Sequence, residues 1–134
     1  MKKFLAAYVA VLIVMLALDF VWLSVTGGPL YRRILGDLLL ERFNVAPAAL
    51  FYLLYGTGIV IFAVSPAFDA HAWTTALVRG LLFGVFAYAT YDLTNQATLR
   101  TWSTVLTVAD VTWGAVLTGV AATAAYAAGG YWND

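Results

Sequence analysis

The sequence contains no cysteine, and its only lysines are Lys2 and Lys3 at the N-terminus. The lack of cysteine excludes disulfide bonds, thiolate metal sites, iron–sulfur clusters and haem attached through thioethers. Terminal lysines argue against a buried Schiff base to retinal or pyridoxal. The single histidine, His71, falls in a short predicted loop and has no partner ligand at metal-binding spacing. We therefore expect no metal site and no cofactor.

Charge is also scarce, at 10% of the residues, whereas 63% are hydrophobic and the mean hydropathy is +0.87. A soluble domain has about 25% charged and 45–50% apolar residues. Seven basic residues balance seven acidic ones, so no net field attracts nucleic acid. The sequence therefore predicts an integral membrane protein that is surrounded by membrane lipids and has no nucleic-acid partner.

Four hydrophobic stretches are long enough to cross a bilayer, whose core of about 30 Å takes roughly 20 helical residues. Pro47 suits the first turn of the second stretch, and Ser103 is a suitable N-cap for the fourth. We predict that residues 1–134 form one all-α domain, a bundle of four transmembrane helices at about 4–24, 47–64, 73–98 and 104–128. Small residues in the last two helices suit close helix packing: Gly80, Gly84, Gly114 and Thr118.

Residues 30–43 (LYRRILGDLLLERF) differ in kind from the four apolar stretches. Apolar residues recur there at helical spacing among five charged ones. This pattern predicts an amphipathic interfacial helix between the first and second spans, which lies on the membrane or caps the bundle. Four crossings place both termini on one side, but the basic residues divide too evenly between the sides to assign the orientation.

Three carboxylates fall inside the apolar spans: Asp19, Asp92 and Asp110. Each costs about 2.5–3.5 kcal/mol at a helix centre, so three of them need a compensating reason. Asp19 and Asp92 lie near the ends of two spans that run in the same direction, and Asp110 lies near the start of the returning span. At 1.5 Å per residue, all three lie roughly 8–12 Å below the surface that carries residues 30–43. We therefore expect the carboxyls to share one layer, and they are the candidate catalytic residues.

Aromatic and polar side chains accompany these acids. Trp22 follows Asp19 by three residues, and Trp113 follows Asp110 by three, which places each pair on one helix face. The repeated Asp-x-x-Trp string also hints at pseudo-symmetry between the first and last spans. The candidate ligand-binding residues are Trp22, Tyr52, Tyr55, Tyr88, Tyr91, Asn95 and Trp113. By contrast, we interpret Trp73, Trp102 and Trp132, which lie near span ends, as anchors at the membrane interface.

Five strings in the sequence closely resemble a bacterial membrane-protein family, the domain-of-unknown-function-2177 family. The resemblance covers nearly the whole chain, and YATYDLTN is its most specific part. It implies a small four-helix, multi-pass protein of the bacterial inner (plasma) membrane, and it assigns no activity to any residue. The strings are DFVWL (19–23), YRRILGDLL (31–39), FYLLYGTGIVIF (51–62), YATYDLTNQATLRTW (88–102) and DVTWG (110–114).

The leading hypothesis is a small integral membrane protein that binds a lipid or another apolar small molecule entering from one leaflet. Asp92 would be the central polar group, with Asp19 and Asp110 as its partners. An enzyme that modifies the bound molecule would use a carboxyl with a raised pKa as acid or base, and this question stays open.

Three alternatives to a binding pocket stay open. The acids could simply hold the helices together through hydrogen bonds. The protein could be a structural or accessory subunit of a larger membrane complex, or a homo-oligomer, docking through its Gly and Ala faces. A proton-coupled transporter is a weaker alternative, because the ionisable groups occupy one side of the bundle only.

Overall fold

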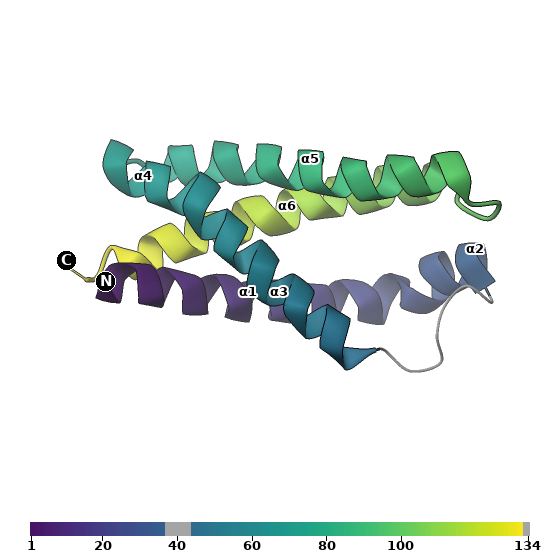
Figure 1. Cartoon of the computed structure of the whole chain (residues 1–134), viewed down its shortest axis with the longest axis horizontal. Coiled ribbons are helices and arrows are strands. Elements are labelled where there is room, and N and C mark those ends of the chain that lie inside the picture. Colours follow the sequence, from purple (N-terminus) through teal and green to yellow (C-terminus); the bar gives the residue numbers. More distant parts are fainter. Residues whose placement is uncertain (37–43, 133–134) are drawn as a thin grey trace.

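The computed structural model describes residues 1–36 and 44–132, and it is an all-α membrane bundle, as predicted. Within these residues, four helices are long and apolar enough to cross a membrane. The first span is α1 (Lys2–Thr26), the third is α5 (Trp73–Thr98) and the fourth is α6 (Thr104–Gly129). The second span is built from three consecutive pieces: α3 (Val45–Ile59), the π-helical η3 (Val60–Val64) and α4 (Ser65–Ala70). The two chain ends lie at the same end of the bundle (Figure 1).

The second span continues to Ala70, six residues beyond its predicted end, and this difference involves a proline. Pro66 lies in the first turn of α4, directly after the π-helical turn of η3. Proline has no backbone N–H, and a π-helical turn changes the hydrogen-bond pattern of the helix that precedes it. The helix therefore passes Pro66 without ending, and it stops at His71, which has the left-handed φ of 53°. The predicted N-cap of α6 is confirmed, because the side chain of Ser103 accepts a hydrogen bond from the Leu106 N–H at 3.2 Å.

The predicted amphipathic segment caps the bundle over its first part. After α1 the chain continues as a π-helix, η1 (Gly27–Arg32), and a short α2 (Arg33–Leu35), which ends at Gly36 with a φ of +53°. The apolar side chains of this segment pack against Trp102 and Leu106 in the loop-side end of the bundle, while its two arginines are exposed. Residues 37–43 of the predicted interfacial helix lie outside the described residues.

Helix α6 is the central helix, and its most extensive interfaces are with α5 and α1. Glycine allows the backbones of α5 and α6 to approach closely. A Cβ added at Gly80 would lie 2.8 Å from the carbonyl oxygen of Thr118, and one added at Gly84 would overlap the Gly114 carbonyl. The small residues predicted to support tight packing therefore do so, which matches the general use of glycine between membrane helices.

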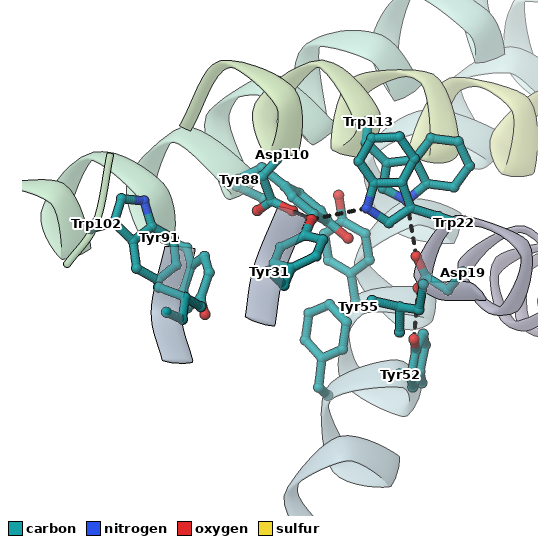
Figure 2. Close-up of a pocket in the computed structure, with 14 residues that line it drawn as sticks. Asp19, Trp22, Tyr31, Tyr52, Tyr55, Tyr88, Tyr91, Trp102, Asp110 and Trp113 are labelled. Carbon is teal, nitrogen blue, oxygen red and sulfur yellow. Dashed lines mark hydrogen bonds between the residues drawn. The ribbon is translucent and has the colours of Figure 1, made fainter. Parts of the chain in front are cut away.

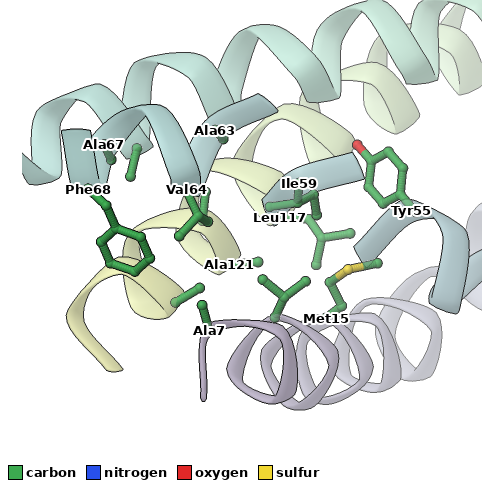
Figure 3. Close-up of a cluster of buried hydrophobic side chains, with 14 residues drawn as sticks. Ala7, Met15, Tyr55, Ile59, Ala63, Val64, Ala67, Phe68, Leu117 and Ala121 are labelled. Carbon is green, nitrogen blue, oxygen red and sulfur yellow. The ribbon is translucent and has the colours of Figure 1, made fainter. Parts of the chain in front are cut away.

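The two halves of the bundle are filled differently. At the end that holds the termini, small and branched side chains from α1, the second span and α6 form a continuous apolar core (Figure 3). Towards the other end, α3 crosses α1 obliquely, and its main contacts are with α1 and its own continuation η3 (Figure 1). The first turns of α3 therefore do not close onto α5 and α6, and a cavity occupies this half.

Candidate ligand-binding site

A cavity of about 440 Å³ lies among α1, α3, α5, α6 and the η1–α2 segment, in the loop-side half of the bundle (Figure 2). Leu23, Phe51 and Tyr91 on its wall are 40%, 43% and 55% exposed, so the cavity opens at the protein surface. Deeper in the wall, Tyr55, Trp102 and Asp110 are buried. Fourteen of the described residues line the cavity, of which nine are aromatic and two are acidic: Asp19, Trp22, Leu23, Tyr31, Leu35, Phe51, Tyr52, Tyr55, Ala87, Tyr88, Tyr91, Trp102, Asp110 and Trp113.

Asp19 joins three helices on one side of the cavity. The Tyr52 hydroxyl of α3 donates a hydrogen bond to one carboxylate oxygen at 2.6 Å. The indole N–H of Trp113, on α6, donates to the other oxygen at 3.0 Å. The helical spacing pairs Asp19 with Trp22 of its own helix, but the structure gives it a tryptophan from α6 instead. Both oxygens of Asp19 therefore have a donor, which fixes the orientation of this carboxylate.

Asp110 is held on the opposite side of the cavity by Tyr31. The Tyr31 hydroxyl donates to an Asp110 oxygen at 2.5 Å, and it accepts a hydrogen bond from the Trp22 indole N–H at 2.9 Å. Burial raises the pKa of Tyr31 above its ordinary value of 10.0, and the hydrogen bond to Asp110 raises it further. The phenol therefore stays neutral near pH 7 and acts as a donor to Asp110.

The two aspartate clusters meet at a pair of stacked indoles. The rings of Trp22 and Trp113 lie 4.6 Å apart and are nearly parallel, at 5° (Figure 2). Through this stack, the two Asp-x-x-Trp strings of α1 and α6 take up related but unequal positions. Trp113 donates directly to Asp19, whereas Trp22 reaches Asp110 only through the inserted hydroxyl of Tyr31. The two hydrogen-bonded clusters are therefore joined by ring stacking into one assembly along the cavity wall.

Asp92 lies behind the wall and not on it. Its side chain is completely buried on α5, against the carboxyl of Asp110. Within the described part of the chain, no donor forms a hydrogen bond with either Asp92 oxygen. Asn95 also lies outside the lining of the cavity. The three acids therefore share one half of the bundle but form two groups, with Asp92 beside Asp110 and Asp19 beyond the indole pair.

The structure places the other candidate residues on the wall and adds several that the sequence did not indicate. Trp22, Tyr52, Tyr55, Tyr88, Tyr91 and Trp113 all line the cavity. Tyr31 was missed as a site residue, although it lies in the segment that was predicted to cap the bundle. Further additions are Leu23, Leu35, Phe51, Ala87 and Trp102.

The interpretation of Trp102 as an interfacial anchor is wrong. Its side chain is 8% exposed, and its indole N–H donates to the hydroxyl of Thr107 at 3.1 Å. The same hydroxyl donates to the side-chain oxygen of Gln96 at 2.7 Å, so the turn between α5 and α6 folds back onto its own helices. Tyr91 packs edge-on against the Trp102 ring at 5.4 Å. The position of Trp102 near a span end does not show that its ring points into the bundle. In the sequence, the polar residues Gln96 and Thr107 were the only indication of a partner for its indole N–H.

The part of the site that the structure describes is acidic and aromatic. In residues 1–36 and 44–132, no three His, Cys, Asp or Glu side chains gather closely enough to hold a metal ion. None of the described lining residues is a lysine, arginine or histidine. Chemically, the wall offers ring faces, two carboxyl groups and phenols to a molecule in the cavity.

Fold and site together define a multi-pass α-helical membrane protein with an aromatic cavity in one half of its bundle. The chain belongs to the family of predicted membrane proteins described as domain of unknown function 2177 (DUF2177), whose model matches residues 4–127. This confirms the resemblance seen in the sequence. No curated protein and no solved structure gives a significant match.

Proposed function

We propose that the protein binds a lipid or another apolar small molecule in the cavity, and that the molecule enters from the membrane. One observation supports this most strongly: a volume of about 440 Å³ whose described lining has nine aromatic side chains and two acids. Small-molecule sites typically measure about 300–1,000 Å³ and combine apolar walls with a few placed polar groups. In a bacterial inner membrane, where we propose that the protein resides, such a site takes its ligand from the bilayer.

The arrangement of the wall supports entry from the bilayer. Leu23 on α1 and Phe51 on α3 are partly exposed, and both belong to membrane-spanning helices. An apolar molecule therefore meets the apolar side chains of Leu23 and Phe51 at the opening, and Asp110 lies in the buried part of the wall. The carboxyls of Asp19 and Asp110 suit a polar head, while the rings contact the apolar remainder of the ligand.

A purely structural role for the acids explains less of the arrangement. Asp19 does hold α1, α3 and α6 together through Tyr52 and Trp113. However, helices that were only pinned together would be expected to fill the space between them, because protein interiors pack densely. The terminal half of this bundle does so around Met15 and Leu117, which are fully buried. The cavity beside Asp19 is unfilled, and this favours a binding site over a purely structural role for the acids.

A substitution that fills the cavity tests the proposal. Ala87 lines the cavity, and Ala87→Phe should occupy much of it. Ala97→Phe is the matched control, because Ala97 is exposed on the same helix. Both variants are purified in lipid nanodiscs and examined by native mass spectrometry with extraction of bound molecules.

We expect a small molecule to accompany the wild type and Ala97→Phe, and to be lost from Ala87→Phe with its thermal unfolding unchanged. A wild type that carries no small molecule, or that carries it equally in Ala87→Phe, overturns the proposal. A stoichiometric protein partner in place of a small molecule would instead support the accessory-subunit alternative.

A further inference from the structure

We propose that the ligand of this cavity is a lipophilic organic cation, an ammonium or similar positive head attached to an apolar body. This inference rests on the proposed binding function and specifies the chemical class of the ligand. Three features of the wall favour a cation: its acidic side chains, its aromatic rings, and the hydroxyl and indole groups that already form hydrogen bonds within the protein.

The charge of the site is one-sided. Asp19 and Asp110 lie on the wall, and the fully buried Asp92 lies directly behind Asp110. No basic side chain among the described residues lines the cavity to balance them. Carboxyl groups inside a membrane protein are costly, and they commonly pair with one another or act as counter-ions to a ligand. A cationic head in the cavity would supply the missing opposite charge.

Asp92 adds a third carboxyl to this side of the site. It is 0% exposed, and in the described part of the chain its oxygens meet the carboxyl of Asp110 and no N–H or hydroxyl donor. A buried carboxyl whose polar neighbour is another carboxyl calls for an explanation. Positive charge in the cavity beside Asp110 would stabilise Asp92 through space, because charges interact strongly in a medium of low dielectric constant.

The aromatic rings face the cavity with most of their polar groups already bonded. Eight lining residues are tyrosine or tryptophan, and six of these use the hydroxyl or indole N–H in a hydrogen bond within the protein. A ligand that needs hydrogen-bond donors, such as a carboxylate or a phosphate, therefore finds few of them, and it also meets two carboxyls. Ring faces are what the wall mainly offers, and they attract cations through their quadrupoles. The stacked Trp22 and Trp113 belong to the wall and lie between the two acidic groups.

Three probes of similar aromatic character and different charge test the inference. Equilibrium dialysis compares tetraphenylphosphonium, neutral triphenylmethanol and anionic tetraphenylborate on nanodiscs of uncharged lipid, with empty nanodiscs as the blank. We expect saturable binding of the cation at least about tenfold tighter than that of the neutral probe, which corresponds to about 1.4 kcal/mol. We expect no saturable binding of the anion. The Ala87→Phe variant should abolish saturable binding of the cation and of the neutral probe.

The acid itself is tested with Asp110→Asn, whose side-chain oxygen still accepts the hydrogen bond from Tyr31. This variant should weaken cation binding about tenfold or more and leave the neutral probe unchanged. Asp69→Asn is the control, since Asp69 is exposed and lies outside the cavity lining.

The outcomes separate the two proposals. Equal binding of the cation and the neutral probe, or the tightest binding by the anion, refutes the cation inference while the binding function stands. Cation binding that is unchanged in Asp110→Asn also refutes it. Absence of saturable binding by every probe, together with no co-purifying molecule, overturns the binding function itself.

Discussion

The same chemical change, aspartate to asparagine, should shift stability in opposite directions at Asp92 and Asp19. Asp92 is fully buried, has no donor within the described residues and lies against the carboxyl of Asp110. The Asp92→Asn variant would replace one of two adjoining carboxyls with an amide whose N–H can donate to Asp110. At Asp19 both oxygens already accept, from Tyr52 and from Trp113. Asparagine keeps an acceptor oxygen for the Trp113 N–H, and its N–H₂ group can donate to the Tyr52 hydroxyl, but both bonds lose the negative charge of the carboxylate.

The expected magnitudes follow from these contacts. Leaving a buried polar group unsatisfied costs about 1–3 kcal/mol. Asp92→Asn should therefore raise the free energy of unfolding by about 1–3 kcal/mol, because it removes one of two adjoining carboxyls and its N–H₂ group can donate to Asp110. Asp19→Asn should lower it by about 1–2 kcal/mol, because two hydrogen bonds to a carboxylate become bonds with a neutral amide. The exposed Asp69→Asn should stay within about 0.5 kcal/mol of the wild type.

The measurement is reversible unfolding in mixed micelles, with an increasing fraction of denaturing detergent and helicity as the signal. All four proteins are compared in one lipid and detergent mixture, so that the surroundings cancel. If Asp92→Asn destabilised the bundle as much as Asp19→Asn does, then Asp92 would hold an essential contact. Its description as a buried carboxyl without an N–H or hydroxyl donor would then be wrong, and with it the second argument for a cationic ligand.

Two further predictions use the same unfolding assay. Gly114→Ala should destabilise the bundle by about 1–3 kcal/mol, because its Cβ would overlap the ring of Tyr88. Gly27→Ala, whose Cβ meets nothing within 4 Å, should change little, and equal effects at the two sites would contradict this packing. Burial raises the pKa of Tyr31 above 10.0, so the folded protein keeps this phenol neutral at a pH where the unfolded chain has lost the proton. The contribution of the neutral phenol to the free energy of unfolding is therefore fully present below pH 10 and decreases as the pH rises further. Above pH 10, the free energy of unfolding of Tyr31→Phe should therefore decrease less steeply with pH than that of the wild type. Identical dependence on pH in the two proteins would exclude this role of the phenol.

The hydrophobic pattern predicted the number of spans correctly because the bilayer leaves a buried backbone few alternatives. The starts of the third and fourth helices, at Trp73 and Thr104, and the cap at Ser103 were also predictable from local signals. The second helix was predicted too short, because a proline following a π-helical turn looks like a stop when only the sequence is considered. Trp102 was misplaced because nearness to a span end does not say whether a ring points outwards or back into the bundle.

Depth in the membrane and direction around the helix axis are different kinds of information. The sequence alone determined that Asp19, Asp92 and Asp110 share one half of the bundle, because depth follows from counting residues along straight helices at about 1.5 Å each. Only the tertiary structure decided that Asp92 lies behind Asp110 and that Trp113, not Trp22, donates to Asp19. Rotation and tilt of each helix depend on the side chains of its neighbours, and the oblique course of α3 leaves the space in which Asp19, Asp110 and the aromatic rings surround a cavity.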